Sequence, residues 1–263
     1  MEVLLLGTGA ADGIPNPFCT CPTCADHRGR GELRTPTSVL LDGRLLIDPG
    51  PEAPRQVSRY GRDLTGLAAV LAGHAHHDHL DPALLLHRSW VTATPIAVAG
   101  PAPVIAWSRP WVDDGYTAIS FTTLSAGDTV ELAGFRVTAL EANHEAFGEA
   151  LCYLIEDGAA RLLYATDTGP LPAATLAALR GRPVELVLLE ETFGDRQDKG
   201  DRHLNLETFA GTLDQLRERG VITATTRVVS IHLGHDNPPV AELAARLALL
   251  GAEVLSDGAV IVL

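Results

Sequence analysis

The stretch that decides the fold runs from residue 67 to residue 79 and reads Leu-Ala-Ala-Val-Leu-Ala-Gly-His-Ala-His-His-Asp-His. Its first five residues are apolar and predict a short buried strand over 67–71. Five ionisable side chains then fall within six residues, which would be costly next to a core unless a cation bound them. Imidazole and carboxylate suit Zn²⁺, Mn²⁺ or Fe. The expected ligands are His74, His76, Asp78 and His79, while His77 is expected to point away.

Other polar residues fall at the ends of other predicted strands: Asp48, His144, Asp167 and His232. Rigid strands can direct such side chains to one place, so we expect them to join the first group. The spacing suggests two ions, one on His74 and His76 and the other on Asp78 and His79. The Asp167 carboxylate would bridge two cations about 3.5–4 Å apart.

The remaining pattern predicts strands alternating with helices. Strands are expected at 3–6, 38–41, 45–48, 67–71, 96–98, 119–122, 129–132, 135–141, 150–156, 161–165, 186–190, 227–231, near 254 and at 260–263. Helices are expected at 52–59, 82–90, 172–180, 206–219 (with Asn205 as its cap) and 239–250. Two strand-rich halves, each followed by helices, predict two packed sheets with helices outside. With no linker or repeat visible, we expect a single domain over 1–263.

The composition of the chain limits the kinds of molecule that it can bind. The chain has 263 residues, 46% hydrophobic and 20% charged, and its formal net charge is −13. Such an acidic balance argues against nucleic acid or an anionic membrane as partner, because both need Lys and Arg. A small phosphorylated substrate remains compatible, since bound cations reverse the local field. The N-terminal apolar run is too short for a leader or a membrane span, so we expect a cytoplasmic protein.

Three cysteines lie within six residues: Cys19, Cys21 and Cys24. Their spacing is poor for disulfides and favours a soft tetrahedral ion, which needs a fourth ligand. His27 is the local candidate, and His235 is the distant one, three residues after His232. Spacing alone leaves both open. Cys152 lies within a strand pattern and is expected to be a small core residue.

The sequence resembles the metallo-β-lactamase superfamily. The matching motifs are Leu-Gly-Thr-Gly near the N-terminus, 47–50, 74–79, 143–144, 166–168 and 231–232, in the family order and over nearly the whole chain. This resemblance implies a four-layer αββα sandwich of mixed α/β class. It also implies one metal on His74, His76 and His144, a second on Asp78, His79 and His232, and Asp167 as the bridge. Asp48 would orient a ligand or the ligand loop from behind.

Two further motifs resemble the PhnP-type phosphoribosyl cyclic phosphate phosphodiesterases of phosphonate degradation. One is the cysteine cluster, and there the resemblance favours His235 as fourth ligand of a structural Zn. The other is the segment before residue 206, which supplies His203 to the active site. The resemblance thus implies hydrolysis of a small phosphodiester, including cyclic ones, by a hydroxide bridging two Zn or Mn ions. Catalytic roles fall to Asp78, Asp167 and His203, the last as general acid or phosphate ligand. A homodimer is also compatible with the resemblance.

Other members of the same superfamily offer competing interpretations. A tRNA 3′-processing nuclease would need a basic exosite arm, which neither the charge nor the sequence supplies. A lactonase or thioesterase fits the double metal motif but not the cysteine cluster. A protein of pyrroloquinoline quinone biosynthesis has a similar cysteine cluster and fold. The hydrolase ligands are altered in that protein, whereas this chain keeps the full set. A binding module without enzymatic activity ranks last.

Overall fold

Two seven-stranded mixed sheets lie at the centre of the computed structural model, which describes residues 1–112, 118–145 and 147–263. In the first sheet the strand order is β14-β1-β2-β3-β4-β5-β6, and in the second it is β13-β12-β11-β10-β9-β8-β7. The strands of the first sheet are β14 (Val260–Val262), β1 (Glu2–Gly7), β2 (Ser38–Leu41), β3 (Leu45–Ile47), β4 (Ala69–Leu71), β5 (Ile96–Gly100) and β6 (Ile119–Thr123). Those of the second are β13 (Glu253–Val254), β12 (Arg227–Ile231), β11 (Leu186–Glu190), β10 (Arg161–Ala165), β9 (Glu149–Glu156), β8 (Phe135–Glu145) and β7 (Thr129–Leu132).

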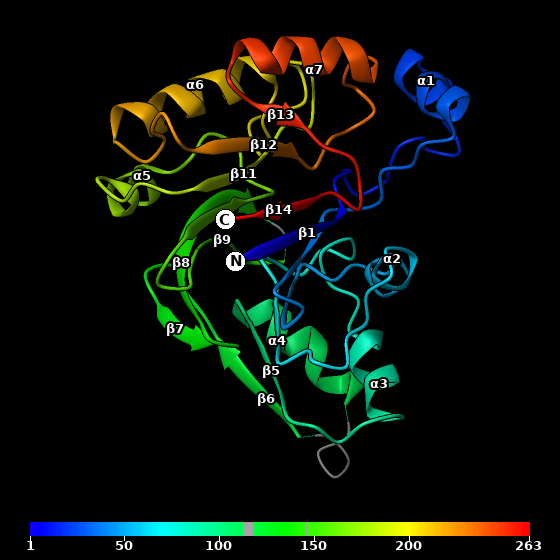
Figure 1. Cartoon of the computed structure of the whole chain (residues 1–263), viewed down its shortest axis with the longest axis vertical. Helices are drawn as coiled ribbons and strands as arrows, with labels where there is room; N and C mark the ends of the chain where they lie inside the picture. Colours follow the sequence, from blue (N-terminus) through cyan, green and yellow to red (C-terminus); the bar gives the residue numbers. More distant parts are fainter. Residues whose placement is uncertain (113–117, 146) are drawn as a thin grey trace.

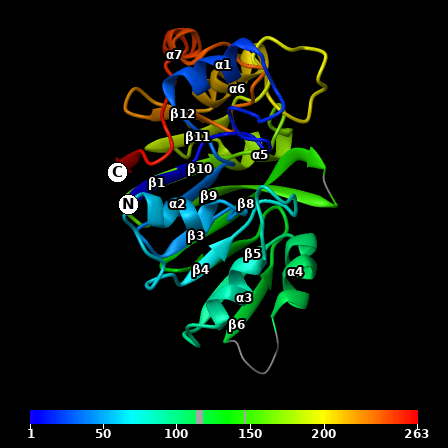
Figure 2. The same cartoon turned by 90° about the vertical axis from the view of Figure 1, so that its right-hand side faces the viewer.

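Helices cover the outer faces of both sheets, as Figures 1 and 2 show. The described helices are α1 (Pro22–Arg30), α2 (Ala53–Arg59), α3 (Ala83–Ser89), α4 (Ala102–Ser108), a 3₁₀ turn η1 (Arg109–Trp111), α5 (Ala173–Leu179), α6 (Leu206–Glu218) and α7 (Val240–Leu249). None of these helices is long and apolar enough to cross a membrane. Layers therefore follow in the order helix, sheet, sheet, helix, and the predicted αββα sandwich is confirmed.

The alternating direction of side chains along each strand explains why both faces of the sheets are covered. In β1, Val3 and Leu5 pack into the core between the sheets, whereas Leu4 and Leu6 pack into the core beneath α2 and α3. In β11, Leu186 faces the inter-sheet core, and its neighbour Val187 faces the core beneath α5 and α6. Successive side chains of a strand point to opposite faces, so strands buried on both faces become continuous apolar runs.

Most predicted elements lie within two residues of their observed bounds, with two kinds of difference. Asn205 caps α6 as predicted, through a capping box with Thr208. Helices α1 and α4 were not predicted, because the charged sequence of α1 and the β-branched residues of α4 give weak helical signals. Strand β8 continues to Glu145, past an irregularity after Glu141, so His144 lies within this strand and not after it.

The strand ends of both sheets meet at one edge of the sandwich. Three residues there, Asp48, Asp167 and His232, have left-handed backbones with φ of 48°, 48° and 54°. Such conformations are rare outside glycine, and where they occur they cluster at functional sites. The sharp turns let the side chains leave the strands and converge.

Candidate metal centre

Two of the groups of ligand atoms at this edge share Asp167, and their residues are buried or partly buried. The first consists of His74, His76, His144 and Asp167, and the second of Asp78, His79, Asp167 and His232. Within each group the ligand atoms all lie within 4.8 Å of one another. The residues that the sequence predicted as active-site ligands are thus brought together, in the two sets that the resemblance implied.

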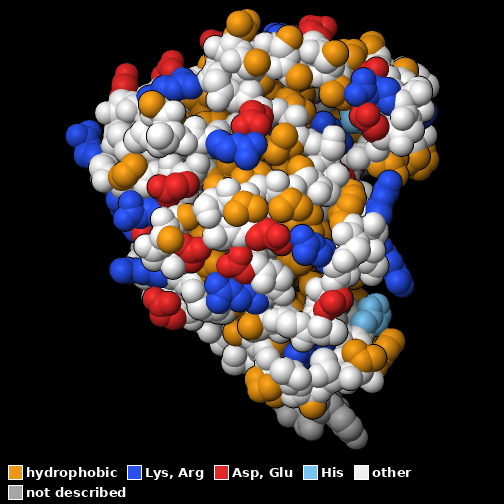
Figure 3. Space-filling view, viewed as in Figure 1, with side chains coloured by type: hydrophobic (Ala, Val, Ile, Leu, Met, Phe, Trp, Pro, Cys, Tyr) orange, Lys and Arg blue, Asp and Glu red, His pale blue; other side chains and the backbone are white. Residues whose placement is uncertain are grey.

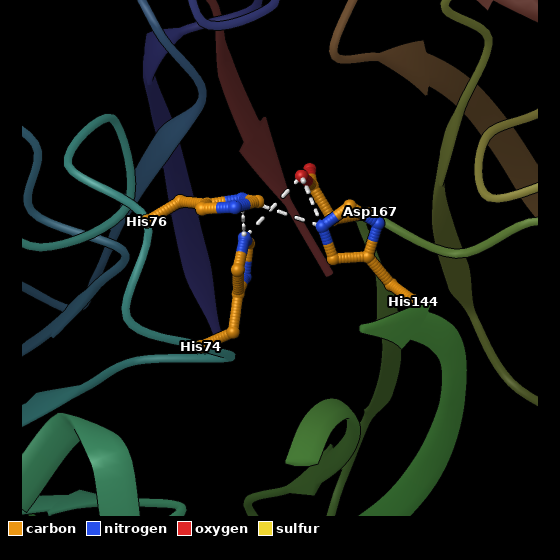
Figure 4. Close-up of side chains that lie close together, drawn as sticks. All are labelled: His74, His76, His144 and Asp167. Atoms are coloured by element: carbon orange, nitrogen blue, oxygen red, sulfur yellow. Dashed lines mark hydrogen bonds and ion pairs between the residues drawn. The ribbon is translucent and has the colours of Figure 1, made fainter. Parts of the chain in front are cut away.

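The first group converges from three separate elements (Figure 4). The Nε2 atom of His74 lies 2.8 Å from Nδ1 of His76 and 3.4 Å from Oδ2 of Asp167. The Nε2 atom of His144 lies 3.3 Å from the same His76 nitrogen and 3.7 Å from Oδ2 of Asp167. Three imidazoles and one carboxylate oxygen therefore surround one point.

The second group uses the other oxygen of Asp167. Its Oδ1 atom lies 3.0 Å from Nε2 of His79 and 3.0 Å from Nε2 of His232. Oδ2 of Asp78 lies 2.9 Å from the same His79 nitrogen and 3.6 Å from that of His232. Since each carboxylate oxygen of Asp167 faces one group, this side chain has the geometry of a bridge.

Unpaired buried atoms show that the second group fits a cation. Oδ2 of Asp78, Nε2 of His79 and Nε2 of His232 are buried and lack a hydrogen-bond partner. Unpaired polar atoms in a core are costly, and each of these three would be satisfied by one shared cation. The donor set of imidazole and carboxylate is the one that Zn²⁺ and similar ions take.

Electrostatics favour the metal-binding form of His74 and Asp167 and oppose it in His79. Burial lowers the pKa of His74 well below its usual value, with a further contribution from the nearby His79. Burial alone would raise the pKa of Asp167, but the adjacent His232 and His79 hold it well below the usual range. Burial alone would lower the pKa of His79, but Asp167, Asp78 and Asp48 raise it well above its usual value. Neutral imidazole and ionised carboxylate are the binding forms, so a metal must displace the proton of His79, whereas His74 and Asp167 already have the binding form.

Asp48 supports the second group from behind. Its Oδ2 atom accepts hydrogen bonds from Nδ1 of His79 at 2.9 Å and from the Tyr164 hydroxyl at 2.8 Å. Its Oδ1 atom accepts one from the backbone N–H of Gly73 at 2.7 Å. With Nδ1–H of His79 donated to Asp48, loss of the second ring proton leaves the Nε2 lone pair for a cation. Asp48 therefore contacts both a ligand and the loop that carries the ligands.

Gly50 allows the ligand loop to lie against the end of β3. A Cβ atom at this position would meet the carbonyl oxygen of Asp78 at 2.1 Å, far inside van der Waals contact. Only glycine lets two backbones approach this closely.

His203 lies beside the second group and is held by Glu190. Nδ1 of His203 lies 3.0 Å from Oε2 of Glu190, and the His203 ring stacks on that of His232 with centroids 5.3 Å apart. Burial lowers the pKa of His203, but the charge and hydrogen bond of Glu190 outweigh it and raise this pKa to about 9. The contact with Glu190 therefore favours the protonated form of the His203 ring.

Glu190 was missed by the sequence analysis. Its fully buried carboxylate also accepts hydrogen bonds from the backbone N–H of Thr168, the hydroxyl of Thr192 and the N–H of Leu204. The available signal was an acidic residue at the end of an otherwise apolar strand, the same signal that singled out Asp48 and Asp167.

Residues 19–24 form the segment called here the cysteine loop. The thiols of Cys19, Cys21 and Cys24 lie together in it, with sulfur atoms within 4.8 Å of one another. Cys21 caps α1 by accepting a hydrogen bond from the N–H of Cys24 at 3.4 Å. Burial raises the pKa of Cys24 to about 12, so metal binding would have to displace its proton. Cys152 is separate from this group and buried in the core beneath α5 and α6.

The imidazole of His235 does not join the thiols. Its Nδ1 atom lies 2.8 Å from Oδ2 of Asp12, and the thiol of Cys21 instead contacts the His235 carbonyl oxygen at 3.4 Å. His27 does not join them either, since its Nδ1 atom faces the carbonyl oxygen of Glu32 at 3.4 Å. Neither imidazole therefore lies in the thiol group, and the predicted fourth position of His235 is not occupied by its ring in this structure.

A cavity of about 280 Å³ opens at the metal centre, beside His232. His203, His232 and His235 line it, together with Phe193 and Lys199.

The layered fold and the double ligand cluster define the class: a protein of the metallo-β-lactamase fold. The family model described as "Beta-lactamase superfamily domain" matches residues 43–233, and the chain belongs to this superfamily. The predicted resemblance is confirmed at that level.

Curated relatives carry several names. Coenzyme PQQ synthesis protein B of Azoarcus sp. (strain BH72) is 27% identical over 99% of both chains. Ribonuclease Z of Mycobacterium marinum (strain ATCC BAA-535 / M) is 26% identical over 90% of both. Octanoyltransferase of Porphyromonas gingivalis (strain ATCC BAA-308 / W83) is 38% identical, but this match covers 30% of the chain and 16% of that protein.

Two solved structures share the fold. Zn²⁺-bound PqqB of Methylobacterium extorquens has a TM-score of 0.80 at 22% identity and covers 100% of both chains. A diphosphatase from the PhnP family has a TM-score of 0.76 at 21% identity and covers 99% of this chain and 96% of that one.

Proposed function

We propose that this protein is a metal-dependent phosphoric diester hydrolase that acts on small phosphodiesters, cyclic ones included. The observation that carries the proposal is His203, held by Glu190, beside two ligand groups that share Asp167. Anionic oxygens of a phosphodiester are the natural partner of such a cluster. The PhnP-family diphosphatase of similar fold lends support.

Two divalent cations, Zn or Mn, would act as Lewis acids on the phosphoryl oxygens and lower the pKa of a water. Asp78 and Asp167 supply the carboxylate ligands of the cluster. Asp48 fixes the tautomer of His79. His203 donates a proton from Nε2 to the leaving oxygen, while Glu190 accepts its Nδ1–H. The ring stack on His232 limits rotation of His203 about its own axis.

The cysteine loop is proposed to hold a structural Zn through Cys19, Cys21 and Cys24. His235 stays a candidate for the fourth position only if its ring leaves Asp12. We further propose a cytoplasmic location and a small phosphorylated substrate. Basic and acidic side chains are interspersed on the face seen in Figure 3, which shows no large basic patch of the kind a polyanion would need.

The experiment is a panel of aryl phosphodiesters, a thioester and a lactone, assayed with the Zn- and Mn-loaded protein. We expect hydrolysis of bis-p-nitrophenyl phosphate to exceed that of the other two classes. If His203 is the general acid, His203→Ala should slow phenyl esters by about 10²–10⁴-fold and p-nitrophenyl esters much less, since p-nitrophenolate leaves without a proton. An equal effect on both esters would remove His203 from proton transfer, and dominant thioester or lactone turnover would overturn the phosphodiesterase.

A second candidate is a cofactor-pathway protein like coenzyme PQQ synthesis protein B. It is favoured by the full-length match and by the TM-score of 0.80. Metal content separates the two, because a hydrolase needs both ligand groups of the active site loaded. A purified protein with a single Zn at the cysteines, and no turnover of any ester, would favour this second candidate.

A further inference from the structure

A second cavity, of about 750 Å³, opens between α2 and α3 on the outer face of the first sheet (Figure 1). Its volume lies in the range of cavities that hold small organic ligands. Among the residues that the structure describes, none of the proposed metal ligands lines this cavity. It is therefore a site separate from the metal centre.

The walls of this cavity are apolar. They are made by side chains of α2, of α3 and of the segments next to these helices: Pro51, Pro54, Leu64, Leu67, Leu84 and Val91. Leu67 belongs to the core beneath the helices and is 3% exposed, whereas Val91 is 83% exposed and lies at the mouth. The cavity thus leads from solvent to the core, and an apolar group that enters it is removed from water.

Basic side chains outnumber acidic ones around this cavity. Arg55 of α2 and Arg88 of α3 line it together with His87, and Asp81 is the acidic residue among the described lining residues. Oδ1 of Asp81 already accepts a hydrogen bond from the N–H of Ala83 at 3.0 Å. This local excess contrasts with the whole chain, whose formal net charge is −13. The cavity therefore favours an anion over a cation.

The guanidinium group of Arg88 is partly buried and forms no ion pair with the described residues. Its Nη2 atom donates to the carbonyl oxygen of Thr94 at 2.6 Å, which leaves further N–H groups for a ligand. Burial lowers the pKa of Arg88, and no neighbouring acid opposes this effect. A partly desolvated charge without a counter-charge is costly, and a bound anion would offset that cost.

We propose that this cavity binds a small soluble amphipathic anion. The head group contacts the guanidinium groups of Arg55 and Arg88, since guanidinium binds the oxygen atoms of such anions in a bidentate geometry. The apolar body packs along Leu64, Leu67 and Leu84. The site requires neither the metal ions nor the proposed hydrolysis, so its test does not depend on either.

The floor of the cavity adjoins the loop that carries the metal ligands. Gly50 lines the cavity, and a Cβ atom there would meet the carbonyl oxygen of Asp78 at 2.1 Å. Asp81 lines it as well, and its N–H donates to the carbonyl oxygen of Pro49 at 2.9 Å. Substitutions at these positions would disturb the metal centre, so a test of the cavity has to use other lining residues.

Calorimetric titration with alkanesulfonates tests the apolar walls. We expect one decane-1-sulfonate to bind per chain, about 50-fold more tightly than heptane-1-sulfonate, because each buried methylene raises affinity roughly fourfold. Decyltrimethylammonium has the same chain length with the opposite charge, and it should bind at least about tenfold more weakly than decane-1-sulfonate. Equal affinities of the two sulfonates, or tighter binding of the cation, would overturn the proposal.

Variants around the mouth test the position of the head group. Arg55→Gln and Arg88→Gln should each weaken the binding of decane-1-sulfonate about 3–10-fold, through loss of a partly exposed charged hydrogen bond. Val91→Glu should weaken this binding and Val91→Lys should strengthen it, and both should fold because Val91 is 83% exposed. Arg59→Gln is the matched control, at an exposed position of α2 outside the cavity, and should leave the affinity unchanged. Wild-type affinity in both arginine variants and in Val91→Glu would refute the site.

A second copy of the chain is the other occupant that could cover these apolar walls. Light scattering during the same titration detects it, and we expect decane-1-sulfonate to leave the molar mass of the protein unchanged. Dissociation of a dimer by decane-1-sulfonate, together with a monomeric Val91→Glu variant, would assign the cavity to a subunit interface and overturn the small-ligand site.

Discussion

Replacing Asp48 by Asn should lower both the stability of the fold and metal binding at the second ligand group. The carboxylate of Asp48 is fully buried and receives three donors: the N–H of Gly73, Nδ1–H of His79 and the hydroxyl of Tyr164. Asparagine keeps the shape of the side chain and tolerates the left-handed backbone at φ 48°. The change therefore alters hydrogen bonding and charge with little steric effect.

The size of the effect follows from the lost acceptor. An amide keeps one oxygen for Gly73, but its NH₂ group faces two donors, from His79 and Tyr164, in place of the accepting Oδ2. Hydrogen bonds to a charged group contribute roughly 1.5–3 kcal/mol each and are not additive, so we expect a loss of about 3 kcal/mol in the free energy of unfolding. His79 also loses the acceptor that fixes its tautomer, so metal affinity should fall by roughly 10–100-fold.

Urea denaturation with a chelator present measures the first quantity, and calorimetric titration with Zn²⁺ measures the second. Tyr164→Phe is the matched control, because it removes one donor from Asp48 and leaves His79 supported. We expect it to cost about 1 kcal/mol and to leave metal affinity unchanged. Metal affinity of Asp48→Asn within twofold of wild type, or an equal loss in Tyr164→Phe, would refute this account of His79.

Three further predictions concern the backbone, the cysteine loop and pH. Gly50→Ala should displace the ligand loop and lower both stability and metal content, because its Cβ would meet the Asp78 carbonyl oxygen at 2.1 Å. Gly66→Ala is the control: the atom nearest to its Cβ is 3.8 Å away, so the melting temperature and the metal content should both stay unchanged. Cys21→Ser should remove one Zn per chain and lower the melting temperature while the remaining turnover per active site is kept; a normally folded variant with unchanged Zn content contradicts the structural site. The folded pKa of Glu191, about 8, lies above its unfolded value of about 4.3, so its contribution to stability is full below the unfolded value and is lost as pH rises through the folded one. The free energy of unfolding, measured by denaturation between pH 5 and 9, should therefore fall by about 4 kcal/mol more for wild type than for Glu191→Gln, and parallel pH profiles would contradict the raised pKa.

The ligand cluster could be predicted because its signal is local. The run His74–His79 places four ligands within one loop, and Asp167 and His232 each follow a plainly apolar strand. Strand ends of packed sheets meet at an edge, so residue type and position together were enough to group these side chains. Only the placement of His144 differed, since the irregularity in β8 allows the strand to continue past it.

The supporting residues could not be predicted in the same way. Glu190 contacts His203 across 13 positions, and Asn237 contacts Glu191 across 46, with loops between them whose path no periodicity specifies. His235 shows the converse: its spacing after His232 is suggestive, yet the nearby Asp12 takes its ring nitrogen. Such contacts depend on the three-dimensional path of loops, which single-sequence patterns do not encode.

Left-handed backbones at Asp48, Asp167 and His232 bear on how the metal centre is built. Residues held in such conformations cost on the order of 1–3 kcal/mol each, and they persist only where their surroundings fix them. Here the surroundings are hydrogen bonds from outside the ligand cluster: Gly73 and Tyr164 hold Asp48, and the His232 N–H donates to the Thr37 hydroxyl at 3.0 Å. The ligand atoms thus converge because the sheets and their buried polar contacts position them. Binding energy of the cations is then not spent on ordering the ligands, and the residues behind the cluster should determine metal affinity as much as the ligands themselves.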